Sequence, residues 1–536
     1  MSIHRLPADI PHELSTYMDS QSIRAMAQAW RPMHKALHGP HGSTGKYQIE
    51  LEKYGMVEGV IPHAHRNKST KELRDMLASY NLALSFLKWN RYDIYRFSQT
   101  EKRTTFVDDI HLHHNFGSFM GQSGGWIYHI KTSVVEMIRP PSLRAATETI
   151  RIEKGYPFQV VGFAVEPSSG LTAVLQANEQ GISRIHIMHP SRTDFSPKVL
   201  SSYVRWPIGT VKPAQFEIVG NFVAIMVQQL MPAQNGVQVW KRSSLVVWNW
   251  AEGTLKYVKE DVQSFQFISE DTLLILHFGR PRRAPQGENL TLKVCQVQVT
   301  RDDPYDISLP DVEVDMLWQT IKAVSFIPRT TPPAKPHPAH DPYFDDWVTG
   351  VFDAPLPSKE ENGPFHADPE KSVIGIQIDF HPQYHSMSAC LLFDLKEFVA
   401  PPSLPRAMCC VDGIYPFING RRVFWWNPAA KNICQRDFNA ISLRLYGRGI
   451  QNSRHDKDPN YLSSSFPMFG HYPPNANAPF GLNSFEAAAM RRGDWMQMRH
   501  FYATEDSVVI MQKSSQDKIG STYVHVLTFD HCSLFG

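Results

Sequence analysis

The feature that most constrains this chain is a change in the spacing of its apolar residues near residue 95. Before that point, apolar residues recur every three or four positions, which is the period of an amphipathic helix. From residue 96 to residue 536, short β-type runs alternate with Gly, Pro, Asn and Asp. We therefore expect a mainly β chain that is preceded by a small helical region.

A repeated unit is visible in the β region. In residues 267–276 (FISEDTLLIL) and 501–511 (FYATEDSVVIM), an acidic pair precedes an apolar strand. A further strand with an aromatic or polar ending often follows, and such segments are candidates for the third strand of a unit. The seven candidates are 125–130, 183–189, 244–250, 292–299, 389–395, 421–427 and 523–530.

These units favour a β-propeller. A strand-rich unit that cannot bury both of its faces alone must stack on its neighbours. The spacing of roughly 60 residues exceeds the ~40–45 of compact blades, so long loops are expected, and residues 328–369 and 448–485 are the obvious ones. We predict a propeller-like C-terminal domain of seven blades, with six as the alternative count and a β-sandwich as the competing architecture.

The N-terminal region contains two short helical patterns and one long one. Residues 6–18 and 20–30 carry the short ones, with a break and a plausible N-cap at Asp19-Ser20. Ser69 and Glu72 form a capping-box signature for the long one. The apolar positions that follow predict an amphipathic helix packed on a neighbouring domain, and they are Leu73, Met76, Leu77, Tyr80, Leu84 and Leu87.

Residues 6–37 resemble an F-box. The chain has the opening Leu-Pro of that family, two apolar helical stripes and the acidic turn between them. It departs from the family pattern at Pro11, Trp30 and Met33. The residues that match the two stripes and the opening pair are Leu6, Pro7, Ile10, Leu14, Met18, Ile23, Met26, Ala27 and Ala29.

The wider order of box, helix and strand repeats resembles fungal, especially basidiomycete-type, F-box proteins with a propeller-like region. That resemblance implies an F-box at 1–45, a helical linker at 46–95 and a substrate-binding domain at 96–536. It also implies a function in a Skp–cullin–F-box ubiquitin ligase. The nine matched residues would bind the Skp adaptor, and the propeller would hold a protein client, with no catalytic residue, cofactor or metal on this chain.

Composition and charge argue against two other classes of partner, nucleic acid and membranes. Lys and Arg total 54 and Asp and Glu total 52, a balance that argues against a dedicated nucleic-acid binder. No secretory signal and no run of 18 apolar residues is present, so we expect no membrane partner. None of the six cysteines forms a CxxC pair. We therefore expect a protein of the cytoplasm or nucleus with reduced thiols.

Residues 121–125 (GQSGG) match the GxSxG nucleophile motif of hydrolases. That motif needs a helix after the serine, and the segment that follows has the pattern of a strand. A glycine-rich hairpin turn is the simpler interpretation. A propeller enzyme that uses Ser123 remains a third, less favoured hypothesis.

Three other groups of residues have both a functional and an ordinary interpretation. The histidines at 111, 113 and 114 have strand spacing for a metal site, but no further ligand completes it. The Arg clusters at 280–283 and 421–422 suit an acidic or phosphorylated client, and are otherwise solvated loop charges. The paired tryptophans are expected in the blade core, and they are Trp248, Trp250, Trp425 and Trp426.

The alternative to a ligase subunit is a non-catalytic propeller scaffold with a degenerate F-box. Trp30 and Met33, which depart from the family pattern, motivate it. The two hypotheses differ in one observable property, because only the first predicts that the Skp adaptor is found in the protein's complexes.

Overall fold

The structure is a computed structural model of the 536-residue chain. The structure describes residues 20–29, 47, 49–51, 54–58, 68–86, 91–97, 119–123, 126–131, 133–139, 150–166, 171–178, 181–188, 198–201, 211–231, 239–278, 289–301, 304–309, 312–317, 321–326, 365–368, 372–380, 387–395, 409–412, 414–427, 432–437, 498–503, 507–513 and 522–528.

The strands form antiparallel sheets that follow one another along the chain. In the first three sheets, four consecutive strands pair in chain order. Sheet I contains β3 (Phe119–Ser123), β4 (Trp126–Lys131), β5 (Val134–Arg139) and β6 (Ile150–Gly155). Sheet II contains β7 (Gln159–Val165), β8 (Thr172–Asn178), β9 (Gly181–Met188) and β10 (Lys198–Ser201). Sheet III contains β11 (Val211–Val219), β12 (Phe222–Met231), β13 (Val239–Asn249) and β14 (Thr254–Glu260).

The next three sheets vary this pattern. Sheet IV contains β15 (Ser264–Phe267), β16 (Thr272–Phe278), β17 (Asn289–Gln298), β18 (Asp306–Ser308) and β19 (Val312–Leu317), the last two both paired with β17. Sheet V contains β20 (Ile321–Phe326), β22 (Val373–Phe380), β23 (Met387–Asp394) and β24 (Cys409–Asp412). Sheet VI contains β25 (Ile414–Asn419), β26 (Arg422–Asn427) and β27 (Asn432–Asp437).

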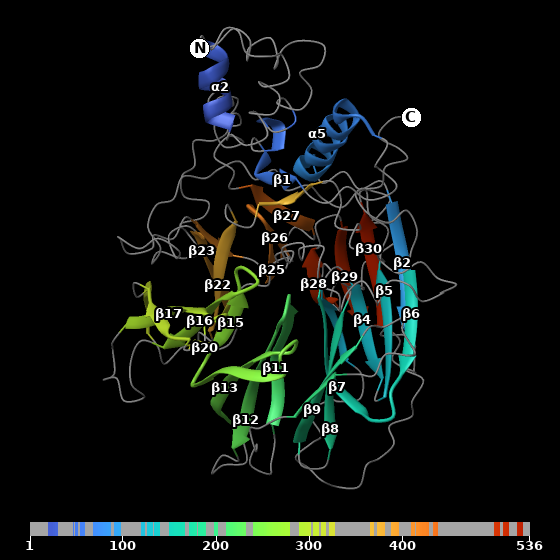
Figure 1. The fold of residues 1–536 in the computed structure, drawn as a ribbon, viewed down its shortest axis with the longest axis vertical. Helices are drawn as coiled ribbons and strands as arrows, with labels where there is room; N and C mark the ends of the chain where they lie inside the picture. The colour runs from blue at the N-terminus through green and yellow to red at the C-terminus, as the bar shows by residue number, and fades with distance from the viewer. Residues whose placement is uncertain are drawn as a thin grey trace.

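Sheet VII joins the two ends of the β region. Its first three strands are β28 (Met498–Ala503), β29 (Ser507–Lys513) and β30 (Thr522–Thr528). Its fourth is β2 (Arg91–Phe97), which precedes sheets I to VI in sequence and pairs with β30. The sheets lie around a ring (Figure 1), and successive sheets touch through their first strands, as β7 with β11 and β25 with β28 do. The fold is therefore mainly β and propeller-like, as predicted.

The core lies between neighbouring sheets rather than at one centre. On β13, Leu245 and Val247 belong to the apolar cluster shared by sheets III and IV, whereas Val246 and Trp248 belong to the cluster shared by sheets II and III. Because successive side chains of a strand point to opposite faces, a strand buried on both faces is apolar at every position. This explains why inner strands such as β13 and β16 carry continuous apolar runs, at residues 245–248 and 273–276.

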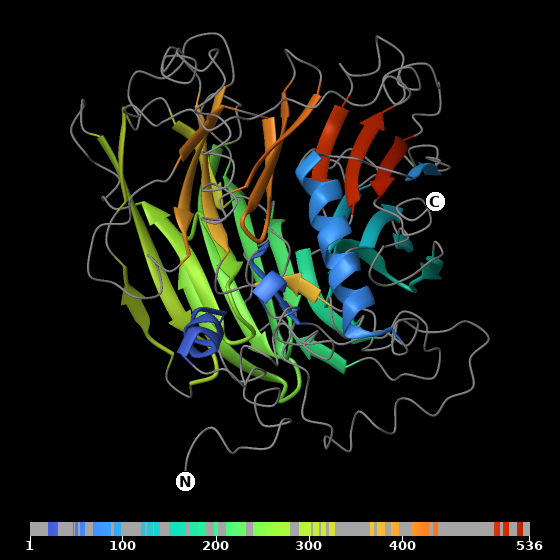
Figure 2. The same cartoon turned by 90° about the horizontal axis from the view of Figure 1, so that it is seen from above.

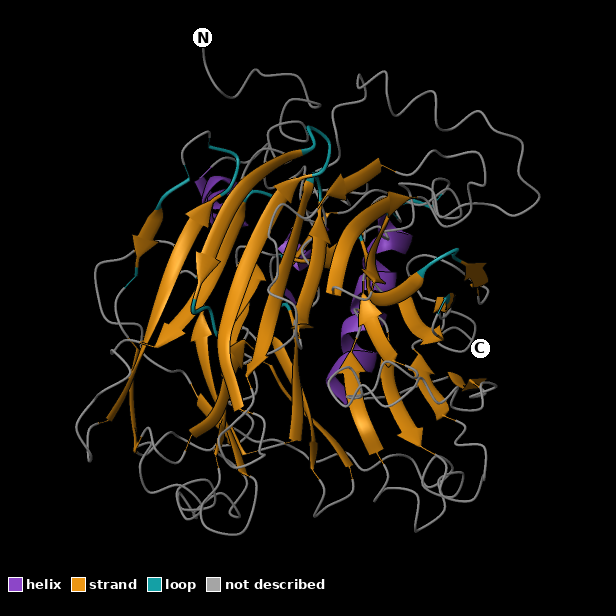
Figure 3. Ribbon diagram, turned by 90° about the horizontal axis from the view of Figure 1, so that it is seen from below, coloured by secondary structure: helices purple, strands orange, loops and turns teal. Residues whose placement is uncertain are grey.

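The helices lie outside the sheets, on one side of the ring (Figures 1 and 2). They are α2 (Ser20–Ala29) and α5 (Thr70–Phe86). A two-stranded sheet of β1 (Met56–Glu58) and β21 (Phe365–Ala367) lies beside α5. Strands dominate the rest of the described chain (Figure 3). Among the described residues, no helix has the length and apolar character needed to cross a membrane.

Most of the predicted strands are confirmed, with two kinds of correction. Five of the seven candidate third strands are third strands, but those at 125–130 and 421–427 form β4 and β26, the second strands of their sheets. Strands also occur where none was expected, at β1 within the predicted helical linker, at β2 across its end and at β21 within the predicted Pro-rich loop. These strands depend on partners far away in sequence, which no local pattern reveals.

Candidate functional site

The structure describes four of the nine predicted adaptor-binding residues. Ile23, Met26, Ala27 and Ala29 lie on α2, whereas Leu6, Pro7, Ile10, Leu14 and Met18 are outside the described residues. Ala27 is buried, Met26 is half-buried and Ala29 is exposed. The described part of the predicted second stripe is thus only partly covered by the rest of the chain.

The helix α5 begins at the predicted capping box. The backbone N–H of Ser69 donates to Glu72 Oε2 at 2.6 Å, and the N–H of Glu72 reaches Ser69 Oγ at 3.3 Å. These bonds satisfy donors that a helix start leaves unpaired. The hydrogen bonds from the Ser69 hydroxyl and backbone hold the pKa of the Glu72 carboxyl below its ordinary value.

One face of α5 is buried, as its apolar spacing predicts. The buried side chains are Leu73, Met76, Leu77 and Tyr80, and the other two predicted side chains, Leu84 and Leu87, are not among those described. The ring of Tyr80 lies 5.4 Å, centroid to centroid, from that of Phe365 on β21, which is fully buried. The prediction of a helix packed on a neighbouring part of the chain is confirmed.

Polar contacts fix the same helix to sheet VI. The guanidinium of Arg422, at the start of β26, donates a hydrogen bond to Asn81 Oδ1 on α5. The β1–β21 ladder continues this attachment, because the N–H of Asp368 donates to the carbonyl of Gly55 at 3.0 Å. We call residues 47–58 and 68–86, as far as they are described, the helical segment. Apolar burial, ring packing on Phe365, the β1–β21 strand pair and the hydrogen bond from Arg422 hold it against β21 and sheet VI.

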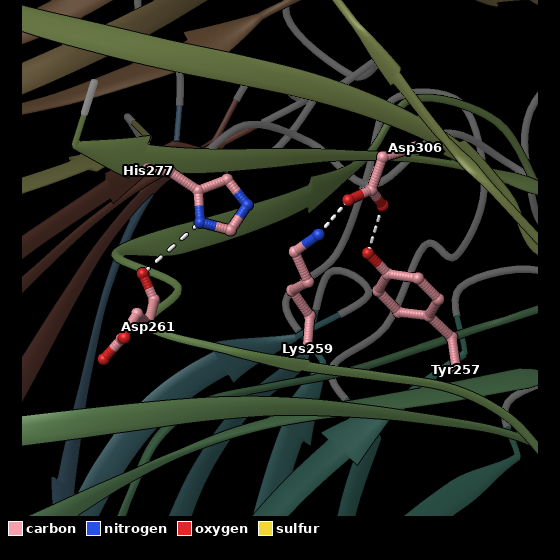
Figure 4. Close-up of polar contacts among 5 residues, drawn as sticks. All are labelled: Tyr257, Lys259, Asp261, His277 and Asp306. Atoms are coloured by element: carbon pink, nitrogen blue, oxygen red, sulfur yellow. Dashed lines mark hydrogen bonds and ion pairs between the residues drawn. The ribbon is translucent and has the colours of Figure 1, made fainter. Parts of the chain in front are cut away.

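A second polar assembly joins sheets III and IV (Figure 4). Asp306 on β18 accepts hydrogen bonds from the hydroxyl of Tyr257 and the ammonium of Lys259, both on β14. His277 on β16 lies beside this pair, and its Nδ1 is 3.3 Å from the carbonyl oxygen of Asp261. We call Tyr257, Lys259, Asp261, His277 and Asp306 the III–IV cluster.

Burial and charge shift the pKa values in the III–IV cluster in consistent directions. Burial, followed by the hydrogen bond to Asp306, raises the pKa of Tyr257 above its ordinary value. Burial opposes ionisation of Asp306, but the bonds from Lys259 and Tyr257 outweigh it and lower the pKa of that carboxyl. Burial lowers the pKa of His277. The cluster therefore holds a phenol, an ion pair and a neutral imidazole near pH 7.

No pattern in the sequence indicates the III–IV cluster. The spacing of Tyr257 and Lys259 places both on one face of a strand, but Asp306 is distant in sequence and lies on another sheet. Local spacing could not have found this arrangement.

The hydrolase motif does not have the geometry that its chemistry needs. Ser123 ends β3 and pairs with Trp126, the first residue of β4, so a hairpin and not a helix follows the serine. The predicted glycine-rich turn fits this arrangement. A nucleophile elbow requires a strand-to-helix turn.

The remaining candidates are structural where they are described. Trp248, Trp250 and Trp425 are buried in the clusters between sheets, as expected for core residues, and the side chain of Trp426 is not among those described. Arg421 pairs with Asp394 at 3.3 Å, and Arg422 binds Asn81. The histidines at 111–114 and the Arg cluster at 280–283 lie outside the described residues. Among the residues that are described, no group of three or more metal-binding side chains converges.

Comparisons with known proteins add little to this geometry. No family model matches the sequence, and no curated protein matches it. The β-propeller domain of Nup133 from Vanderwaltozyma polyspora is 8% identical, with a TM-score of 0.37 over 82% of this chain and 98% of that one. The β-propeller domain of the Trilobed protease from Pyrococcus furiosus is 8% identical, with a TM-score of 0.35 over 76% of this chain and 93% of that one. Likenesses this distant carry no argument about function.

Proposed function

We propose that the chain is an F-box substrate receptor of a Skp–cullin–F-box ubiquitin ligase, acting in the cytoplasm or nucleus. Residues 6–37 would bind the Skp adaptor, and a protein client would bind the ring of sheets. The observation that supports this best is the position of the helices outside the ring, with α5 fixed to β21 and sheet VI. A receptor needs such an arrangement, because one part must bind the ligase while another holds the client.

The partial exposure of α2 is the second support. Met26 is half-buried, and Ala25, Gln28 and Ala29 are exposed. An apolar helical stripe buries its area in a partner's groove at roughly 25 cal/mol per Å². Such a stripe has to be reachable, and the described residues of α2 leave part of it so.

We also propose that sheets I to VII are the blades of a seven-bladed propeller. In this interpretation, β2 completes the last blade, so an N-terminal strand closes the ring against the C-terminal sheet. Loops at either end of the ring would then form the surface that binds the client.

The test is retention of the purified Skp adaptor by the full chain. We expect wild-type protein to retain the adaptor at micromolar concentration, and Leu14→Asp or Ile23→Asp to reduce retention at least about tenfold, because each places a charge within the predicted apolar stripe. Gln28→Asp on the same helix is the matched control, since Gln28 is exposed, and it should bind as wild type does. Wild-type protein that retains no adaptor would contradict the proposal.

The scaffold alternative has its own supporting observation. The helical segment buries four apolar side chains of α5 and pairs β1 with β21, so it stabilises the ring whether or not an adaptor binds. Under this alternative, partners would copurify through the ring and the adaptor would be absent from the complexes.

A further inference from the structure

The III–IV cluster contains a buried acceptor for which the described residues provide no donor. His277 Nδ1 faces the carbonyl oxygen of Asp261, which only accepts, so Nδ1 must carry the ring hydrogen. Nε2 is then a lone-pair acceptor. It is buried and makes no hydrogen bond within the described residues. In Figure 4, Nε2 is on the side of the ring that faces Lys259 and Asp306.

The surroundings explain why the imidazole stays neutral at this position. Lys259 on β14 disfavours protonation of His277, because it already carries a positive charge nearby. Asp306 on β18 and Asp261 favour that protonation. Lys293 is its cross-strand neighbour on β17, and the buried Cys295 and Tyr257 are uncharged near pH 7. Burial is the largest effect and lowers the pKa of His277 below its ordinary value.

The two sheets depend on this cluster at their outer strands. β14 is the last strand of sheet III, and among the described strands β18 pairs only with β17, over three residues. The bonds from Tyr257 and Lys259 to Asp306 therefore join two outer strands that belong to different sheets. The side chains of Lys259 and Asp306 are 36% and 20% exposed, so water and protons reach the cluster.

We propose that the III–IV cluster is an acid-sensitive latch between sheets III and IV, opened when His277 takes up a proton at Nε2. The added proton creates a second cation beside Lys259, which competes with Lys259 for the carboxylate of Asp306. The outer strands β14 and β18 then separate locally. This device belongs to the ring itself and holds whether or not an adaptor binds the N-terminal helices.

The direction of the effect follows from linkage. In the open latch, His277 is solvated and its pKa returns to about 6.5. In the closed latch, the pKa is lower, so the open form binds protons more readily. The closed form is therefore favoured above about pH 6.5 and loses that advantage as the pH falls below it.

The test is hydrogen–deuterium exchange of the full chain at about pH 7.5 and about pH 5.5, corrected for the intrinsic exchange rate. We expect local opening of residues 254–260 and 304–309 to increase about fivefold to tenfold at the lower pH. His277→Asn should abolish the increase, because its amide N–H can replace Nδ1 as donor to Asp261 but does not titrate. Equal protection of wild-type protein at both pH values, or the same increase in His277→Asn, would overturn the proposal.

Two further variants test whether the acid response depends on His277 and Asp306 in particular. His186→Gln removes a different buried histidine, which bonds to Gln176 at 2.7 Å in sheet II, and should leave the response of β14 and β18 unchanged. Asp306→Asn removes the shared carboxylate, so the latch should be partly open already at about pH 7.5 and respond little to acid. A full acid response at β14 and β18 in Asp306→Asn would also overturn the proposal.

Discussion

Asn81 and Arg422 are separated by 341 positions in the sequence and joined by a hydrogen bond from the Arg422 guanidinium to Asn81 Oδ1. Arg422 is 5% exposed. A buried guanidinium that loses a hydrogen-bond partner keeps its desolvation cost without the compensating bond. This one contact therefore couples α5 to sheet VI more strongly than a surface pair would.

Removing the amide should loosen the helical segment. We expect Asn81→Ala to weaken its attachment by about 1–3 kcal/mol, the range for a hydrogen bond to a buried charged group. Limited proteolysis would show faster cleavage within residues 68–86. Lys71→Ala, at an exposed position of the same helix, is the control and should be cleaved at the wild-type rate. Equal rates for both variants would contradict the coupling.

Gly420 should tolerate no side chain. Its φ of +58° favours glycine, and an added Cβ would lie 2.6 Å from the Cβ of Ala367 on β21. We expect Gly420→Ala to lower the free energy of unfolding by about 2–4 kcal/mol, from backbone strain and displacement of β21 together.

Gly253→Ala is the matched control for that prediction. Its φ is +74°, but a Cβ there would meet nothing within 4 Å. Only the backbone strain remains, so a loss of about 1 kcal/mol is expected. Urea unfolding of both variants would measure the difference, and equal losses would show that the contact with Ala367 does not matter.

Asp271 should contribute to acid sensitivity. Burial opposes its ionisation, but hydrogen bonds from Ser269 at 2.7 Å and Thr272 at 3.0 Å outweigh this and lower its pKa. A lowered carboxyl pKa stabilises the native state above the unfolded value of about 3.9, and this contribution is lost as the pH falls through the folded value.

Asp271→Asn should therefore be less stable than wild type near pH 7, and the difference should shrink below about pH 4. Chemical unfolding across that pH range would measure it. A difference that stayed constant with pH would show that the charge of Asp271 is not involved.

The pairing of β2 with β30 gives a fourth prediction. Neighbouring residues of an outer strand alternate between donating their N–H to the ladder and directing it to solvent. Of Ile94→Pro and Tyr95→Pro, one should therefore cost about 3 kcal/mol and the other clearly less. Thermal unfolding of the two variants would compare them. Two equally mild effects would show that closure of sheet VII by β2 contributes little to stability.

The strongest local patterns in the sequence were also the most accurate predictions. The capping box at Ser69 and Glu72 marked the start of α5 because both partners lie within one helical turn. The acidic pair at 270–271 precedes the apolar strand β16, as predicted, and Asp271 bonds to its own neighbours, Ser269 and Thr272. Interactions within a few residues are encoded locally, so sequence alone reveals them.

Strand order was harder to predict than strand existence. The runs at 125–130 and 421–427 are strands, but each is the second strand of its sheet rather than the third. The apolar character of a strand reports burial on both faces, which second and third strands share. The sequence of a strand therefore does not show which position the strand takes in its sheet.

Of the candidate functional residues, only those on the helices α2 and α5 were predicted from the sequence. The apolar spacing of α2 and α5 was visible in the sequence, whereas the partners Phe365 and Arg422 were not. The III–IV cluster was missed for the same reason, since Asp306 meets Tyr257 only when two sheets stack.

The sequence by itself determined that this chain is mainly β, that it carries amphipathic helices before its sheets, and where most strands lie. Periodicity and turn chemistry act over a few residues, so they can be recognised without a structure. Only the tertiary structure decided that β2 pairs with β30, that α5 binds sheet VI and that His277 lies beside an ion pair. Those contacts depend on how distant segments stack, which local patterns leave open.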